Sequence, residues 1–145
     1  PKAGRVNFVA DAPPPLTSAG AIHIAVNDAS CLRPLRRMIA KFLADRPEDL
    51  RIDADLVATE LVTNALEHAS PPRTVAIGYS PAGSLEIAVT DGDPDTDPTL
   101  GRSRLNTYRG RGLTIVDHLA TWGIQRGRAT KTIWAVMARS RYSVA

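Results

Sequence analysis

The hydrophobic positions follow two different periods along the first half of the chain. Residues 21 to 26 form a short run rich in β-branched side chains, which predicts a strand. Apolar residues then recur at helical spacing from about Ser30 to Ala44, and Pro34 fits the first turn of such a helix. The sequence therefore predicts a strand followed by a helix that ends before Pro47.

A second helix has the strongest signal in the chain. Residues 54 to 69 contain neither glycine nor proline, and Asp53 and Asp55 suit the positive end of a helix. The prolines that follow Ser70 stop it. Five apolar positions of this helix are expected to pack on a sheet: Leu56, Val57, Leu61, Ala65 and Leu66.

The second half of the chain is typical of paired strands. Residues 74 to 79 and 84 to 90 predict one antiparallel hairpin, and residues 122 to 125 and 131 to 137 predict another. Residues 113 to 119 predict a short helix between them. This order favours an α+β fold: a two-layer sandwich in which helices cover one face of a mixed, mainly antiparallel sheet.

Length and composition narrow the class of protein. With 145 residues and 43% hydrophobic content, residues 21 to 145 are expected to form one domain, preceded by a loose, proline-rich arm of residues 1 to 20. The single cysteine, Cys31, is expected to be a small buried hydrophobe in a reducing compartment. No run approaches the roughly 20 apolar residues of a membrane span, so we expect a cytoplasmic protein without membrane contact.

The positive charge gives only a weak indication of a nucleic-acid partner. The net charge is +3, but the 18 basic residues are distributed over several segments. Only the stretch from Arg102 to Arg111 is locally basic, and its glycines suggest phosphate binding rather than a nucleic-acid groove. Nucleic-acid binding through this stretch is kept as a minor alternative, and direct contact with nucleic acid is not our expectation.

Polar side chains form a stripe along the second predicted helix. Glu60, Asn64, Glu67 and His68 fall within about 100° of one another around the helix. A solvated face explains Glu67 and His68 equally well, whereas an asparagine in mid-helix needs a reason. A carboxylate one turn before an amide suits phosphoryl transfer, because the amide oxygen is a good magnesium ligand and the carboxylate can orient or deprotonate a hydroxyl.

Two later positions could belong to the same site. Asp91 ends a predicted strand and precedes Gly92, where the carboxylate could accept a hydrogen bond from an exocyclic amine; a plain Asp-Gly turn explains the pair nearly as well. Gly110 and Gly112 stand just before the short helix, where free backbone N–H groups suit phosphate, although a tight turn would also use glycines.

Together, four segments resemble the GHKL ATPases, the superfamily that includes the histidine kinases. The resemblance covers roughly residues 21 to 138, with the segments in the family's order, and is greatest to bacterial anti-sigma-factor serine kinases, which implies the Bergerat-type ATP-binding fold. The segments are Glu60-Leu-Val-Thr-Asn64-Ala-Leu-Glu-His68-Ala, Val89-Thr-Asp91-Gly92, Gly110-Arg-Gly112-Leu113-Thr-Ile-Val-Asp117 and Lys131-Thr132-Ile-Trp134.

The resemblance implies a role for each matching residue. Asn64 matches the family's magnesium ligand, and Glu60 matches its catalytic base. Asp91, with Gly92 beside it, matches the aspartate that reads adenine, and Thr132 matches a threonine that supports the adenine end.

The second glycine box of the family supplies the expected phosphate site. Gly110 and Gly112 match its glycines, and the box extends here over Arg109, Arg111 and Leu113. The resemblance implies that backbone N–H groups and the helix start hold the phosphates, with the arginines neutralising charge. Residues from about 96 to 109 match the lid over the nucleotide.

The chain departs from the family at its first glycine box. Where the family usually has Asp-x-Gly-x-Gly, this sequence has Asp91-Gly-Asp93-Pro94-Asp95, so both later glycines are missing. Proline stiffens this backbone, and the extra carboxylates sit near the expected triphosphate, which electrostatics disfavours.

The resemblance predicts an ATP- and Mg²⁺-dependent serine/threonine protein kinase. Its expected partners are a sigma factor, which it sequesters, and an anti-anti-sigma antagonist of the STAS type, which it phosphorylates; homodimerisation is plausible by the same resemblance. The altered glycine box motivates a second hypothesis, a non-catalytic regulatory module that binds proteins through a degenerate nucleotide site.

Overall fold

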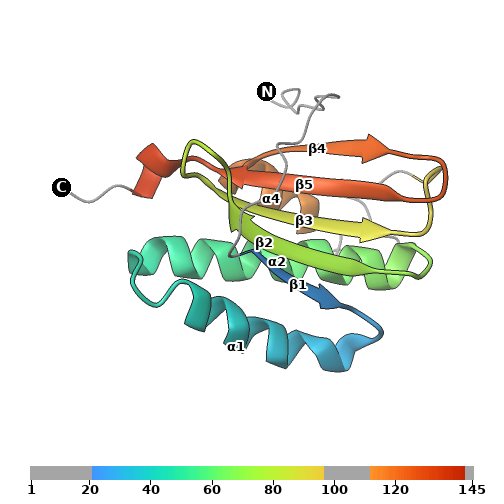
Figure 1. The fold of residues 1–145 in the computed structure, drawn as a ribbon, viewed down its shortest axis with the longest axis horizontal. Coiled ribbons are helices and arrows are strands. Elements are labelled where there is room, and N and C mark those ends of the chain that lie inside the picture. Colours follow the sequence, from blue (N-terminus) through green and yellow to red (C-terminus); the bar gives the residue numbers. More distant parts are fainter. Residues whose placement is uncertain (1–20, 97–111, 143–145) are drawn as a thin grey trace.

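A computed structural model describes residues 21–96 and 112–142 of the chain and places one sheet against a layer of helices (Figure 1). The sheet has five strands in the order β1-β2-β3-β5-β4, and every neighbouring pair is antiparallel. The strands are β1 (Ile22–Ala25), β2 (Thr74–Tyr79), β3 (Leu85–Asp91), β4 (Thr121–Arg126) and β5 (Lys131–Met137).

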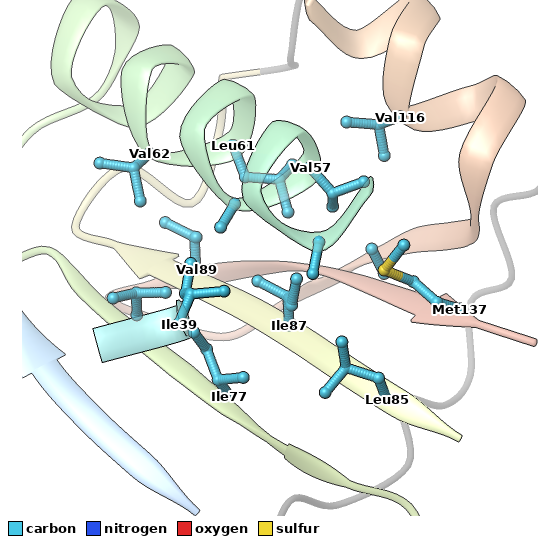
Figure 2. Close-up of a cluster of buried hydrophobic side chains, with 14 of the residues drawn as sticks. Ile39, Val57, Leu61, Val62, Ile77, Leu85, Ile87, Val89, Val116 and Met137 are labelled. Atoms are coloured by element: carbon cyan, nitrogen blue, oxygen red, sulfur yellow. The ribbon is translucent and has the colours of Figure 1, made fainter. Parts of the chain in front are cut away.

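The helices lie along one face of this sheet, as Figures 1 and 2 show. The α+β prediction is therefore confirmed, with antiparallel pairing throughout the described sheet. None of the helices in the described ranges is long and apolar enough to cross a membrane. The helices are α1 (Leu32–Phe42), α2 (Glu48–His68) and α4 (Gly112–Leu119), with short 3₁₀ turns η2 (Ala29–Cys31) and η3 (Arg139–Tyr142).

The predicted elements all occur, and the largest error concerns the start of α2. This helix begins at Glu48, six residues before the predicted position at residue 54. Pro47 precedes it, and Glu48 and Asp49 lie in the first turn, where negative charge stabilises the N-terminal end of a helix. The segment 1–20, which the sequence predicts to be a loose arm, lies outside the described residues.

The first helix starts from a capped 3₁₀ turn. The carboxylate of Asp28 accepts a hydrogen bond from the backbone N–H of Ser30 at 2.9 Å, which satisfies one of the free donors at the start of the turn. Cys31 ends the turn and is half-buried rather than buried. Desolvation raises the pKa of its thiol, and the nearby charge of Asp28 raises it further, so Cys31 has the character of a packing residue and not of a nucleophile.

The core lies between α2 and the central strands (Figure 2). Val57 and Leu61 of α2 are fully buried and face Ile87 and Val89 of β3. Each such side chain contributes roughly 1.5–3 kcal/mol to folding when it is removed from water. The floor under the polar stripe of α2 is therefore a packed, rigid surface.

The prediction that Leu56 packs on the sheet is wrong. Its side chain is 40% exposed, because residue 56 lies about 100° around the helix from Val57 and projects away from the core. Small side chains at Ala54 and Ala58, which the prediction did not include, face the sheet instead.

The sheet face opposite the helices holds a buried carboxyl group. Side chains alternate along β3, so Glu86 points away from the helix layer while Leu85 and Ile87 point toward it. Glu86 is 1% exposed and pairs with Gly78 and Val136 on the neighbouring strands, and neither carboxylate oxygen has a hydrogen-bond partner among the residues that the structure describes. Burial raises the pKa of Glu86 to about 7, since an unpaired charge is costly there.

Gly92 has a structural reason to be glycine. Its backbone N–H donates to the carbonyl of Ser70 at 2.7 Å, which ties the end of β3 to the loop after α2. A Cβ at this position would overlap the carbonyl group of Pro71. The close approach of two backbone segments therefore requires Gly92, whatever its part in binding a ligand.

Candidate functional site

Helix α2 places Glu60 and Asn64 one turn apart, and both side chains are half-buried. Asn64 has no hydrogen-bond partner within the part of the chain that the structure describes. A half-buried amide whose donors and acceptor are free is suited to a ligand, and its oxygen is of the type that Mg²⁺ prefers. The remaining members of the polar stripe, Glu67 and His68, are exposed, and His68 Nε2 lies 3.7 Å from Glu67 Oε1.

Asp91, at the end of β3, is buried in an ion pair with Lys131, the first residue of β5. Lys131 Nζ lies 3.1 Å from Oδ1 and 3.0 Å from Oδ2 of the carboxylate, and the residues are 1% and 3% exposed. Lys131 Nζ also donates to the carbonyl of Asp93 at 3.1 Å and to Thr96 Oγ1 at 3.0 Å. The ammonium group thus ties the segment after β3 to the neighbouring strand.

The carboxylate of Asp91 keeps limited capacity for a ligand. Its Oδ1 accepts from Lys131 and from the backbone N–H of Asp93 at 2.8 Å, and its Oδ2 accepts from Lys131. A carboxylate has about four acceptor positions. One position on Oδ2 therefore remains for a donor such as an exocyclic amine.

Thr132 lies on the other face of the sheet from Asp91. The register pairs Thr90 with Thr132 and Asp91 with Lys131, and neighbouring residues on a strand point to opposite faces. The hydroxyl groups of Thr90 and Thr132 are 2.7 Å apart. The structure therefore brings Lys131, and not Thr132, to the side of Asp91, while the role predicted for Thr132 stays a prediction.

The expected phosphate site falls only partly on described residues. Arg109, Gly110 and Arg111 lie outside them, whereas Gly112 is the first residue of α4. Leu113 is 2% exposed and anchors the start of α4 in the core. Since α4 packs against α2, the helix that carries Glu60 and Asn64 also borders the helix that follows the glycines.

The donor set allows one way of holding a metal ion. No three His, Cys, Asp or Glu side chains within residues 21–96 and 112–142 are grouped to bind a metal. Asn64 could still hold Mg²⁺ together with phosphate oxygens and water, since this ion is commonly bound by few protein ligands.

A family model described as the histidine kinase-like ATPase domain matches residues 25–136 of this chain, most of its length. The chain belongs to this family. The matched range contains Glu60, Asn64, Asp91 and Thr132, so the predicted site lies within the domain that defines the family. Membership of this family implies that the domain binds ATP, usually with Mg²⁺. It also supports a kinase-like regulatory role for the chain.

The similar proteins belong to larger chains. The sensor histidine kinase TrcS of Mycobacterium tuberculosis is 34% identical over 116 residues, covering 66% of this chain and 23% of its own length. The crystal structure of the RsbU and RsbW domains of Rv1364c from Mycobacterium tuberculosis has a TM-score of 0.55 at 18% identity, covering 81% of this chain and 32% of that one. This likeness supports the fold alone.

A second similar structure is the histidine kinase domain of a blue-light activated histidine kinase from Erythrobacter litoralis. It has a TM-score of 0.48 at 17% identity, covering 78% of this chain and 61% of that one. The present chain thus spans 23% of the length of the kinase TrcS and 32% of the chain holding the RsbU and RsbW domains.

This histidine kinase-like domain has a tethered segment after Asp91. The carbonyl of Asp93 accepts from Lys131, and the carbonyls of Pro94 and Thr96 accept from Arg126 Nη1 at 2.6 and 3.1 Å. Strands β4 and β5 therefore hold residues 93 to 96 from one side. Two basic side chains therefore bind the backbone of the segment that carries the extra carboxylates of Asp93 and Asp95.

Sequence reasoning gave Lys131 no role of its own in this histidine kinase-like domain. An acid at the end of one strand and a base at the start of another would have suggested the pair, had the pairing of β3 with β5 been predicted. The two residues are 40 positions apart, and the intervening stretch carries no signal that fixes the strand register.

Proposed function

We propose that this chain is an ATP-dependent serine/threonine protein kinase of the anti-sigma-factor type. Its partners would be a sigma factor, which it sequesters, and an anti-anti-sigma antagonist, whose hydroxyl side chain it phosphorylates in the cytoplasm. The observation that carries the proposal is the pair formed by Glu60 and Asn64, one turn apart on α2 in a member of the histidine kinase-like ATPase family. Within the described residues, Asn64 has no hydrogen-bond partner.

Each residue has a defined part in this proposal. Glu60 orients the antagonist's hydroxyl group and accepts its proton as the γ-phosphoryl group is transferred. Asn64 would hold Mg²⁺, which when bound neutralises charge on the phosphates. Asp91 accepts from the exocyclic amine of adenine through its remaining acceptor position, and the backbone N–H groups at the start of α4 bind the phosphates.

Replacing Asn64 with alanine is expected to weaken the binding of magnesium-ATP at least about tenfold, because the change removes the proposed metal ligand. Isothermal titration calorimetry on the wild type and the variant measures this directly. Asn27→Ala, the same chemical change at an exposed loop position, serves as the control and should bind like the wild type. Equal affinity of Asn64→Ala and wild type would contradict the proposal.

Glu60→Gln is expected to lower phosphoryl transfer to the antagonist at least about 100-fold while leaving magnesium-ATP binding nearly unchanged, since it removes a base but keeps the shape of the side chain. Transfer of labelled phosphate from ATP gives the rate. Glu67→Gln, two turns further along α2 on an exposed side chain, is the matched control. Full transfer activity in Glu60→Gln would rule out the catalytic role.

A second candidate is a non-catalytic module that regulates by protein contact alone. The tethering of residues 93 to 96 by Lys131 and Arg126 favours it, because this segment replaces a glycine-rich loop with one held by internal hydrogen bonds. No measurable binding of magnesium-ATP by the wild type, together with intact binding of a sigma factor, would identify this function in place of the kinase.

A further inference from the structure

A groove of about 1160 Å³ runs between α1 and the first half of α2. Helix α1 contributes Arg33, Arg36 and Arg37 to its lining, and α2 contributes Ile52 and Leu56. The groove is partly open to solvent, and its two walls belong to helices that pack against each other. Among the described residues that we assign to the nucleotide, none lines it.

The floor of the groove is unusually apolar for an exposed surface. Ile52 is 54% exposed and Leu56 is 40% exposed, and they account for two of the three exposed large hydrophobic residues in the described part of the chain. They lie one turn apart on α2, so they form a continuous apolar strip parallel to the helix axis. Exposed apolar strips rimmed by polar residues commonly mark protein-binding surfaces.

The α1 wall of the groove is strongly basic. Arg36 is paired with Asp55 of α2, with Nη2 3.0 Å from Oδ2. Arg33 and Arg37, one turn apart on the exposed side of α1, have no partner among the residues that the structure describes. Like charges at this spacing weaken a helix by about 0.2–0.5 kcal/mol. The lining also holds Arg51 and Glu48, so its four arginines outnumber its two acidic residues, and the groove presents net positive charge beside an apolar strip.

We propose that this groove, defined by Arg33, Arg37, Ile52 and Leu56, docks an acidic amphipathic helix of a partner protein. A helix lies along a groove of this shape with apolar side chains on Ile52 and Leu56 and carboxylates toward the free arginines. A nucleic acid would leave the apolar strip unmatched, and a flat bilayer fits a recessed groove poorly. The inference does not rest on nucleotide binding and is testable without ATP.

The test uses a defined probe, a fluorescein-labelled helical peptide of about 15 residues with leucine at positions i, i+3, i+4, i+7 and i+11 and glutamate or alanine elsewhere. Fluorescence anisotropy with the full chain is expected to show saturable binding. A second peptide with lysine in place of each glutamate is expected to bind at least about tenfold more weakly. Amide chemical-shift changes on peptide addition should cluster on α1 and on α2 around Ile52 and Leu56.

Two variants decide the location. The double variant Arg33→Glu/Arg37→Glu and the single variant Leu56→Ser should each weaken binding of the acidic peptide at least about tenfold. The double variant Arg128→Glu/Arg139→Glu makes the same charge change on exposed residues far from the groove in sequence and should bind like the wild type. Circular dichroism and thermal melting check that each variant is folded.

Several outcomes would overturn the inference. The first is that the acidic peptide shows no saturable binding below about 1 mM. The second is that the Arg128→Glu/Arg139→Glu control weakens peptide binding as much as the groove variants do. The third is that the lysine peptide binds with the same affinity as the acidic peptide. A different occupant would be indicated if the wild type bound phosphatidylglycerol vesicles or duplex DNA but not the peptide, and if the groove variants lost that binding. If the chain bound the peptide but not ATP, the result would support this inference and contradict the proposed kinase function.

Discussion

Lys131→Met is expected to destabilise the domain by about 3–5 kcal/mol, because it leaves the carboxylate of Asp91 buried without its partner. Lys131 is 3% exposed, and the three N–H donors of its ammonium group are shared among four oxygen atoms of Asp91, Asp93 and Thr96. Typical domains have only about 5–15 kcal/mol of stability, so the effect is large. Urea unfolding followed by circular dichroism measures the free energy of unfolding of each variant.

Two controls separate the ion pair from the loss of a long side chain. Lys41→Met, at an exposed position of α1, should change the free energy of unfolding by no more than about 0.5 kcal/mol. The double variant Asp91→Leu/Lys131→Met should recover most of the loss, since an apolar pair of similar volume carries no desolvation cost. A single variant Lys131→Met as stable as Lys41→Met would show that the pair contributes nothing.

The same pair shows where a sequence stops determining a site. Glu60 and Asn64 are four residues apart on one helix, so their common face follows from helical geometry alone. The contact between Asp91 and Lys131 depends on the register of β3 against β5, which only the folded sheet fixes. Local spacing therefore predicted half of the candidate site, and the partner of its aspartate had to come from the structure.

The fold was predictable for a related reason. Alternating and helical periods along the chain identify every strand and helix of the described sheet and helix layer. Hydrophobicity alone did not predict which side of α2 faces the core, because Leu56 is apolar yet exposed while Ala54 and Ala58 are small and buried. The exposed Leu56 instead lines the groove beside α1. Exposing a large apolar side chain to water is unfavourable, and such exposure is typical of a docking surface that a partner covers.

Raising the pH from about 4.5 to about 8 is expected to lower the stability of the wild-type domain, and Glu86→Gln is expected to remove this dependence. Burial raises the pKa of Glu86 from 4.5 to about 7. Below pH 4.5 the carboxyl group is protonated in both states. Between 4.5 and about 7 the unfolded chain has lost its proton while the folded chain keeps it, so stability falls with pH until both states are ionised.

The full loss in the free energy of unfolding has an upper limit of about 3–4 kcal/mol, since the shift from 4.5 to about 7 spans about 2.5 pKa units and each unit corresponds to about 1.4 kcal/mol. Urea unfolding at several pH values measures this loss. As the pH rises, the free energy of unfolding of Glu86→Gln should increase relative to that of the wild type. Glu67→Gln applies the same change to an exposed carboxylate and should leave the wild-type dependence in place. If Glu86→Gln followed the wild-type curve at every pH, burial would not raise the pKa of Glu86 and the prediction would be wrong.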